Sequence, residues 1–362
     1  MDNLEYSVPY NGDPETLEEI FKLAGSSKNI IREIYLSGPQ LYSGSGRVMP
    51  PLNDHEFIEI IEQIRSKKIR INLLMNSTCE GSSWYLPELM SFKLSYLERI
   101  HKDHGVEAVT VANPIYIKHI RGLLPNIEIC ASVLADIDCV QRADIYTRAG
   151  ADILTIDVNI NRDLDLLEEI KDTTGAELKL MVNEGCLYKC PLRKFHLNYT
   201  SHKAKELGIE GDHLFNLECN EIISEDNSQI LKSCWIRPED TSKYKKITKF
   251  FKIVGRELPR NTLLRSVKAY LDENWHGDIM DILCASLKKF SLLHAAYLDN
   301  KSLDRYRFFE TVTSCHRNCG RCNYCNELAK NLVKFGVISN GKLDDVGLED
   351  MADNLRAAAK LS

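Results

Sequence analysis

The feature that most constrains the fold is a repeated alternation between short apolar runs and longer segments with helical spacing. The apolar runs lie at residues 30–36, 69–75, 106–111, 127–133, 153–158, 178–183 and 250–254. Most of them end at a polar, proline or glycine turn, and a segment with helical periodicity follows. This order predicts parallel strands joined by helices. One further strand is expected between the last two runs, at 214–217 or at 233–236.

Eight strands, each followed by a helix over about 250 residues, predict a (β/α)8 barrel. A doubly wound open sheet is the alternative, because the elements between 207 and 240 are ambiguous. We expect the barrel to occupy residues 1–275 and a cysteine-bearing helical segment to occupy 276–362. The stretch from 327 to 361, rich in Leu, Ala and charge, is expected to be helical and to pack against the barrel.

Charge and composition exclude several classes of protein. A formal net charge of -6 argues against a general nucleic-acid binder, because phosphates need a positive surface, so direct contact with nucleic acid is not expected. The first residues lack the pattern of a signal peptide, and no apolar run reaches the ~18 residues that span a bilayer. We therefore expect a cytoplasmic protein without a membrane partner. Cytosolic thiols stay reduced, so the 12 cysteines point to metal rather than to disulfides.

The first cysteine set is Cys186, Cys190, Cys219 and Cys234. Cys186 and Cys190 directly follow an expected strand, and Pro191 suits the first turn of a helix whose dipole would favour a thiolate. Because the strand-end loops of a barrel converge on one face, four distant thiols can surround one metal. The alternative is that Cys219 and Cys234 are small buried hydrophobic residues.

The second set is denser, with Cys315, Cys319, Cys322 and Cys325 inside eleven residues. Their spacers are polar and contain glycine, which is not the composition of a packed core. Four thiolates can hold either Zn²⁺ or a 4Fe-4S cluster, and the spacing leaves both open. The sequence therefore predicts a metal site in the carboxyl-terminal segment.

Polar residues at expected strand ends are candidates for substrate contacts. Asn76, Asn113 and Glu184 could hydrogen-bond a substrate, and Arg237 and Arg256 could each hold a carboxylate through two hydrogen bonds. Of these, Glu184, Arg237 and Asn76 are the catalytic candidates. The alternative for each is a turn-capping or salt-bridging role.

Three segments carry a resemblance to a known family. They are Met181-Val-Asn-Glu184 with Cys186, the Cys-Trp-Ile-Arg-Pro-Glu-Asp stretch at 234–240, and Phe-Lys-Ile-Val-Gly-Arg at 251–256. With weaker matches at Tyr35, Gly38 and Arg47, residues 28–275 resemble the barrel of the peptidase U32 (collagenase-like peptidase) family.

The resemblance implies an iron-sulfur barrel. Members bind a 4Fe-4S cluster through four barrel cysteines, and several act in oxygen-independent hydroxylation of ubiquinone precursors, tRNA or ribosomal RNA. Carried over, the cluster ligands would be Cys186, Cys190, Cys219 and Cys234. The ligand spacing departs from that of the better-known members, which also have no counterpart of the second cysteine set.

Three functions follow as hypotheses. The first is an iron-sulfur-dependent enzyme that hydroxylates or otherwise modifies a biosynthetic or RNA substrate, with the second cluster relaying electrons or bracing the carboxyl-terminal segment. Its partners would be a small or protein-bound substrate and a redox partner or related subunit. The second is a peptidase, although the sequence has neither His-Glu-x-x-His nor Gly-x-Ser-x-Gly. The third is a non-catalytic metal-binding partner protein.

Overall fold

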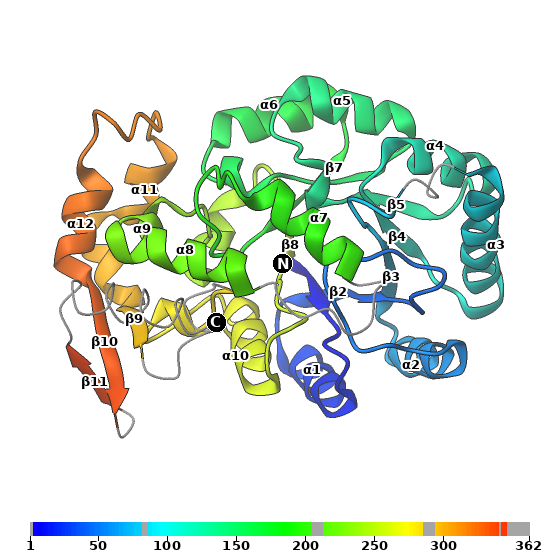
Figure 1. The fold of residues 1–362 in the computed structure, drawn as a ribbon, viewed down its shortest axis with the longest axis horizontal. Coiled ribbons are helices and arrows are strands. Elements are labelled where there is room, and N and C mark those ends of the chain that lie inside the picture. The colour runs from blue at the N-terminus through cyan, green and yellow to red at the C-terminus, as the bar shows by residue number, and fades with distance from the viewer. Residues whose placement is uncertain (1–2, 82–85, 204–212, 285–293, 340–341, 346–362) are drawn as a thin grey trace.

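Eight parallel strands close into a barrel in chain order, and β8 pairs with β1 (Figure 1). The computed structural model describes residues 3–81, 86–203, 213–284, 294–339 and 342–345. The barrel strands are β1 (Glu5–Pro9), β2 (Ile30–Ser37), β3 (Arg70–Met75), β4 (Ala108–Val111), β5 (Glu128–Ala131), β6 (Ile153–Thr155), β7 (Glu177–Met181) and β8 (Phe250–Lys252). The predicted (β/α)8 barrel is confirmed, and the open sheet is excluded.

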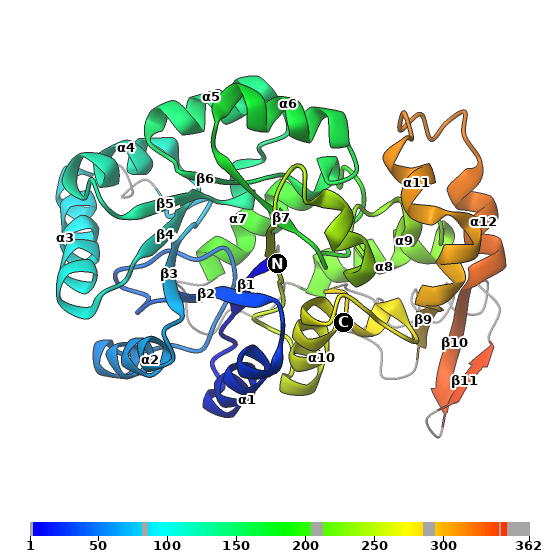
Figure 2. The same ribbon diagram turned by 180° about the vertical axis from the view of Figure 1, so that it is seen from behind.

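The helices that follow the strands form the outer layer of the barrel (Figures 1 and 2). They are α1 (Pro14–Ser26), α2 (Asp54–Ser66), α3 (Pro87–His104), α4 (Pro114–Leu123), α5 (Val140–Ala149), α6 (Leu164–Thr174) and α10 (Arg260–Leu271). Helix α7 (Arg193–Lys203), which follows β7, instead lies across the carboxyl-terminal end of the barrel. Local sequence fixes several starts. Asn53 and Glu56 form a capping box at α2, and the side chain of Asp13 accepts the Glu15 N–H at α1. Each cap satisfies amide groups that the helix itself leaves unpaired.

Two strand assignments differ from the sequence prediction. The strand β1 was not predicted, because it has five residues, includes Ser7 and ends at Pro9, so its hydrophobic pattern is short. Residues 214–217 lie inside helix α8 (His213–Glu225), and 233–236 form a loop after α9 (Gln229–Lys232). The prediction of a strand between β7 and β8 is therefore wrong, and β1 supplies the eighth strand.

The interior of the barrel contains a buried ion pair. Lys179 of β7 and Glu33 of β2 are fully buried, and Lys179 Nζ lies 2.7 Å from Glu33 Oε1. Glu33 also accepts hydrogen bonds from Ser7 (2.5 Å) and Asn72 (3.1 Å), while Lys179 donates to the sulfur of Cys130 (3.1 Å). Burial opposes ionisation of Glu33, but Lys179 and these hydrogen bonds outweigh it and lower the pKa of Glu33 to about 2. The network fills the barrel interior with paired groups.

Arg32 of β2 closes the amino-terminal end of the barrel. Its guanidinium lies 2.8 Å from Glu177, 3.1 Å from Glu5 and 3.1 Å from Glu128, which begin β7, β1 and β5. It also stands 4.3 Å from the ring centroid of Phe250, the first residue of β8. One cation thus ties together the starts of four strands.

The connection from β7 to β8, residues 182–249, contains α7, α8, α9 and the 3-10 helix η4 (Pro238–Tyr244). Beyond α10, the chain continues beside α9, to one side of the barrel, in both views (Figures 1 and 2). Its elements are the 3-10 helices η5 (Ile279–Asp281) and η7 (Asn300–Tyr306), helices α11 (Phe308–Thr313) and α12 (Tyr324–Leu332), and the antiparallel strands β9 (His294–Leu298), β10 (Val333–Ser339) and β11 (Lys342–Asp345).

The carboxyl-terminal elements pack on the β7–β8 connection through buried contacts. Arg237 donates to Asp304 (2.6 Å) and Asn300 (3.0 Å), and the rings of Trp235 and Phe308 stack at 5.4 Å. The stretch from 327 to 361 was expected to be helical, but helix α12 ends at Leu332 and strand β10 begins at Val333. Residues 340–341 and 346–361 of that stretch lie outside the described ranges. β-branched Val and Ile in the β10 sequence favour a strand there.

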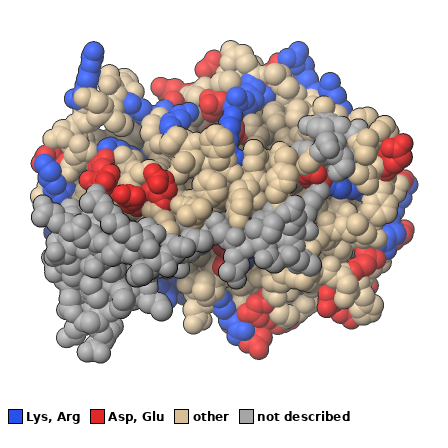
Figure 3. All heavy atoms as spheres, viewed as in Figure 1, with Lys and Arg blue, Asp and Glu red and all other residues tan. Residues whose placement is uncertain are grey.

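Charges of both signs are interspersed over the described part of the face in Figure 3. Across the described ranges, every helix is too short or too polar to cross a membrane.

Candidate active site

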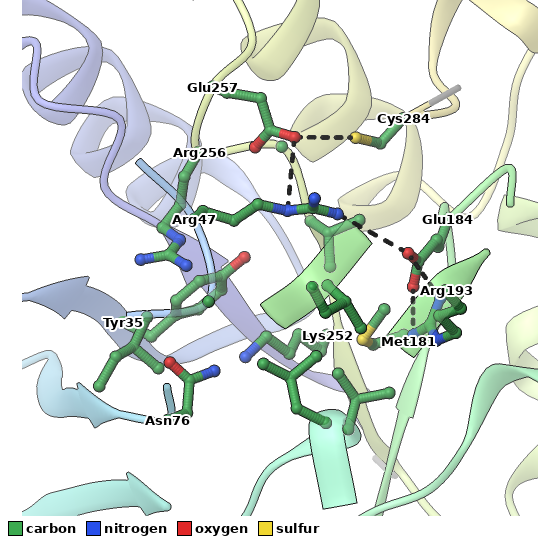
Figure 4. A pocket seen from close by; sticks show the side chains of 17 residues that line it. Tyr35, Arg47, Asn76, Met181, Glu184, Arg193, Lys252, Arg256, Glu257 and Cys284 are labelled. Atoms are coloured by element: carbon green, nitrogen blue, oxygen red, sulfur yellow. Dashed lines mark hydrogen bonds and ion pairs between the residues drawn. The ribbon is translucent and has the colours of Figure 1, made fainter. Parts of the chain in front are cut away.

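A cavity of about 70 Å³ opens at the carboxyl-terminal ends of the barrel strands (Figure 4). Tyr35 of β2, Met181 of β7 and Lys252 of β8 line it from the barrel, and Asn76 lines it from the loop that follows β3. This is the face on which barrel enzymes carry their active sites, because the strand-end loops meet there.

The loop after β2 places Arg47 over the cavity, and two of its glycines allow this approach. A Cβ atom on Gly46 would lie 2.5 Å from Leu134 Cδ1, and one on Gly44 would overlap the carboxylate of Glu80. The carbonyl of Gly44 accepts the Asn76 N–H at 3.0 Å, which joins this loop to the end of β3. The loop after β2 is therefore packed against the site.

Four cations and two carboxylates line the cavity: Arg47, Arg193, Lys252, Arg256, Glu184 and Glu257. Arg193 lies 3.1 Å from Glu184, and Arg47 stands between Glu184 (4.0 Å) and Glu257 (3.9 Å). Burial raises the pKa of Glu184, but Arg193 and Arg47 outweigh it, so the net shift of this pKa is downward. Both carboxylates are thus engaged by two of the four cations.

The other two cations face the cavity without such partners. Lys252 Nζ stands 3.8 Å from the ring centroid of Tyr35, and burial, together with repulsion from Lys179, lowers the pKa of Lys252 to about 7. Arg256 donates to Ser37 Oγ (2.6 Å) and Ser45 Oγ (3.2 Å). Within the part of the chain that the structure describes, neither Lys252 nor Arg256 forms an ion pair with a carboxylate.

Three of the four barrel thiols gather beside this cavity. The thiol of Cys186 donates to Glu184 Oε1 at 3.1 Å. Cys190 and Cys219 are hydrogen-bonded to each other, and this bond, with backbone N–H groups at the start of α7, lowers the pKa of Cys190 to about 6. The same bond and burial raise the pKa of Cys219, and burial followed by the charge of Glu184 raises the pKa of Cys186.

Cys234 is turned away from these three. Its Sγ lies 3.5 Å from the carbonyl oxygen of Asn159 and lines another cavity, together with cysteines of the carboxyl-terminal segment. Among the described residues, no three His, Cys, Asp or Glu side chains stand as a ready-made metal-ligand set. As arranged, the four thiols of the resemblance do not form one ligand set, and the 4Fe-4S cluster stays a prediction, as do the second set and its Zn²⁺ alternative.

The polar candidates from the sequence separate into two groups. Asn76, Glu184 and Arg256 line the cavity. Arg237 instead ties the carboxyl-terminal elements to the β7–β8 connection, and the side chain of Asn113 accepts an N–H at the start of α4. The last two therefore have the salt-bridging and capping roles that were the alternative.

Several residues that line the cavity were not predicted from the sequence as site residues. Arg47 had only a weak family match, although a charged residue after a Gly-Ser loop at a strand end is a usable signal. Lys252 is a lysine inside the apolar run Phe-Phe-Lys-Ile-Val, which marks it as unusual for a buried strand. Cys284 reaches the cavity because its N–H donates to the carbonyl of Asn183 (2.7 Å), a contact that no local pattern announces.

The fold and the site together define a (β/α)8-barrel protein with a cation-lined cavity at the catalytic face of such barrels. The sequence profile of Peptidase family U32 matches residues 19–272. The chain belongs to Peptidase family U32, as the resemblance implied.

Two similar proteins support this assignment. An uncharacterized protease, MJ1657 of Methanocaldococcus jannaschii, is 32% identical over 340 residues, which are 91% of this chain and 99% of that protein. The solved structure of the U32 peptidase Mk0906 has a TM-score of 0.52 and 20% identity, and the match covers 72% of this chain and 95% of that one. At that identity, the second likeness concerns the fold.

Proposed function

We propose that this chain is an enzyme that binds the anionic group of its substrate, such as a carboxylate, in the barrel cavity. The observation that carries the proposal is the pair of buried cations, Lys252 and Arg256, which face the cavity without a carboxylate partner among the described residues. Burying an uncompensated charge costs several kcal/mol, so an anion that enters between these groups is strongly favoured. Arginine adds a planar fork that matches a carboxylate.

Lys252 is suited to both binding and proton transfer. With a pKa of about 7, its amine exists in charged and neutral forms near physiological pH. The charged form attracts an anion, and the neutral form accepts a proton from a bound substrate, as a general base with a pKa near the working pH does best. Tyr35, whose ring lies against the amine, fixes its position.

The reaction that we propose is the one that the family resemblance implies, an oxygen-independent hydroxylation or a related iron-sulfur-dependent modification. The gathering of Cys186, Cys190 and Cys219 beside the cavity supports it, because Cys186 is hydrogen-bonded to the cavity residue Glu184. The formal net charge of -6 favours a small or protein-bound substrate over RNA, because a nucleic-acid backbone needs a positive surface.

Peptide hydrolysis, the activity in the family name, has less support. A cysteine nucleophile needs a lowered pKa, whereas burial and Glu184 raise the pKa of Cys186, the thiol nearest the cavity carboxylates. The thiol with a lowered pKa, Cys190, is hydrogen-bonded to another cysteine rather than to a histidine base.

Calorimetric titration tests the anion site with three probes: succinate, inorganic phosphate and the neutral succinamide. We expect at least one anion to bind at pH 6.5 and succinamide not to bind. Lys252→Ala and Arg256→Ala should each weaken binding about tenfold or more, the effect of losing one charge-assisted contact of ~1.4 kcal/mol. Arg148→Ala, which removes an exposed arginine on the outer face of α5, is the matched control.

The pH dependence supplies a second readout. Affinity for the anion should fall as the pH rises through 7, because Lys252 loses its charge, and Lys252→Arg should flatten this profile. Equal binding of succinamide, or unchanged binding in both alanine variants, would refute the anion site.

The reaction class needs a separate experiment in cells. Metabolites and RNA nucleosides are compared in anaerobically grown cells that carry the wild-type gene, no gene, or Cys186→Ser. A modification restored by the wild type and lost with Cys186→Ser supports thiol-dependent catalysis. If the serine variant restores every modification, Cys186 is not needed, and a non-catalytic metal-binding role becomes the better account.

A further inference from the structure

A second cavity, of about 40 Å³, lies between the barrel and the carboxyl-terminal segment. Four thiols line it: Cys234 of the β7–β8 connection, Cys315 and Cys319 of the segment that links α11 to α12, and Cys325 in the first turn of α12. Cys322, which the sequence groups with the last three, is exposed and does not line this cavity. The structure therefore pairs one barrel thiol with three of the four clustered ones.

The loop that carries two of these thiols is held in a specific conformation. Arg317 lies between Cys315 and Cys319 with φ of +54°, and its N–H donates to Cys315 Sγ at 3.2 Å. A non-glycine residue in this region is uncommon and persists when surrounding contacts hold it. The guanidinium of Arg317 does so, because it lies 2.7 Å from Asp163 at the start of α6.

The charge around the thiols suits an anionic centre. Arg162, Lys232 and Arg317 also line the cavity. Arg162 is buried and donates to the carbonyl oxygens of Leu231 (2.7 Å) and Trp235 (3.1 Å), yet in the described ranges it has no ion pair with a carboxylate. Four thiolates around Zn²⁺ or around a 4Fe-4S cluster leave a net negative charge, which Arg162 and its neighbours would offset.

We propose that Cys234, Cys315, Cys319 and Cys325 are the ligands of one metal centre that joins the barrel to the carboxyl-terminal segment. Cys322 is outside this ligand set, and Cys186, Cys190 and Cys219 form a separate set at the barrel cavity. The shared chemistry is a centre with four thiolates, which takes either an iron-sulfur cluster or zinc. This assignment does not depend on the anion site or on the reaction proposed above.

Metal analysis of anaerobically purified full-length protein tests the ligand set. Iron, acid-labile sulfide and zinc are measured for the wild type and for Cys234→Ser, Cys325→Ser, Cys322→Ser and Cys139→Ser. We expect Cys234→Ser and Cys325→Ser to lose the same centre, which is about four iron and four sulfide for a cubane or about one zinc. Cys322→Ser should keep the wild-type content, as should Cys139→Ser, a cysteine at the start of α5.

Alkylation of the unmutated protein gives an answer even if a serine variant fails to fold. Cys319 and Cys322 are both exposed in the structure, so they form a matched pair within one loop. With metal bound, iodoacetamide should label Cys322 and spare Cys319; after a chelator is added, it should label both.

Any of three results would overturn the ligand set, and two of them concern the carboxyl-terminal cysteines. One is loss of the centre in Cys322→Ser with retention in Cys234→Ser, which would place all four ligands in the loop. The other is equal labelling of Cys319 and Cys322 in the metal-loaded protein. A folded Cys186→Ser variant that loses the same metal as Cys234→Ser would also refute the proposal, because the two thiols would then belong to one centre.

Discussion

At the scale of single residues, the most consequential pair is Lys179 with Glu33 inside the barrel. Replacing Lys179 with methionine leaves the carboxylate of Glu33 buried without its cation, and the expected loss of unfolding free energy is about 3–5 kcal/mol. The double variant Lys179→Met with Glu33→Gln should be less destabilised than the single one, because neither charge of the pair remains. Urea denaturation measures both, with Lys268→Met on the exposed side of α10 as the control.

The same pair predicts that the free energy of unfolding falls at low pH, which we call the acid limb. The folded pKa of Glu33, about 2, lies below its ordinary value of 4.5, so the stabilisation is fully present above pH 4.5 and is lost as the pH falls towards 2. In Lys179→Met the cation that lowers this pKa is gone and burial favours the neutral carboxyl, so the acid limb of Glu33 should shrink or reverse. Equal stability of the single and double variants, with the same acid limb as the wild type, would contradict this account.

Which site residues could be predicted depended on whether a local pattern marks them. Asn76 and Glu184 directly follow apolar runs, and a strand end is visible in the sequence. Arg193 was not predicted as part of the cavity, because its place depends on how α7 is oriented, and helical spacing does not fix that orientation. For Cys234, the local sequence pattern indicates only that it is a candidate metal ligand. Which other thiols it faces is decided by the packing of the carboxyl-terminal segment.

At the scale of elements, the loop after β2 is the part of the site that is easiest to disturb. In Gly44→Ala the new methyl group would meet the carboxylate of Glu80 and the side chain of Ser77, so the loop must shift. We expect a loss of about 1–3 kcal/mol of stability and weaker binding of the anionic probe, because Arg47 moves with the loop. Thermal unfolding and calorimetric titration measure the two effects.

Gly122→Ala is the matched control for this loop. Nothing lies within 4 Å of its added Cβ, and the residue is in the last turn of α4, so alanine should stabilise slightly and leave binding unchanged. Wild-type stability and binding in Gly44→Ala would show that the close packing of the loop is not required.

The order and type of most barrel elements could be read from periodicity, whereas β1 and β10 could not. Long amphipathic helices such as α2 give a strong repeated signal, supported by a capping box. The five residues of β1 give little signal, because their pairing with both β2 and β8 is a property of the closed barrel rather than of the segment. Similarly, β10 is specified by its pairing with β9 and β11. That pairing cannot be predicted from the composition of residues 327–361, which favours a helix.

At the scale of the whole molecule, Arg237 is expected to control how firmly the carboxyl-terminal segment is held. Arg237→Met removes the contacts to Asp304 and Asn300 and leaves Glu239 nearby without this cation, so we expect a loss of about 2–4 kcal/mol. Limited proteolysis should then cleave between residues 300 and 330 faster than in the wild type. Anion binding in the barrel cavity should be unchanged.

Lys243→Ala is the control for this prediction, since Lys243 contacts Glu310 of α11 but is partly exposed. It should have a much smaller effect on cleavage. If Arg237→Met weakens anion binding as much as it accelerates cleavage, Arg237 acts on the barrel cavity, in line with its prediction from the sequence as a catalytic candidate.

The closed amino-terminal end of the barrel determines how molecules can travel. Arg32 and its three glutamates occupy that end, and the Lys179 network fills the space above it, so the barrel offers no passage from one side to the other. The barrel cavity is therefore a dead end. Under the proposed enzymatic function, a product would leave through the same opening by which its substrate arrived, and the next turnover would wait until that opening is clear.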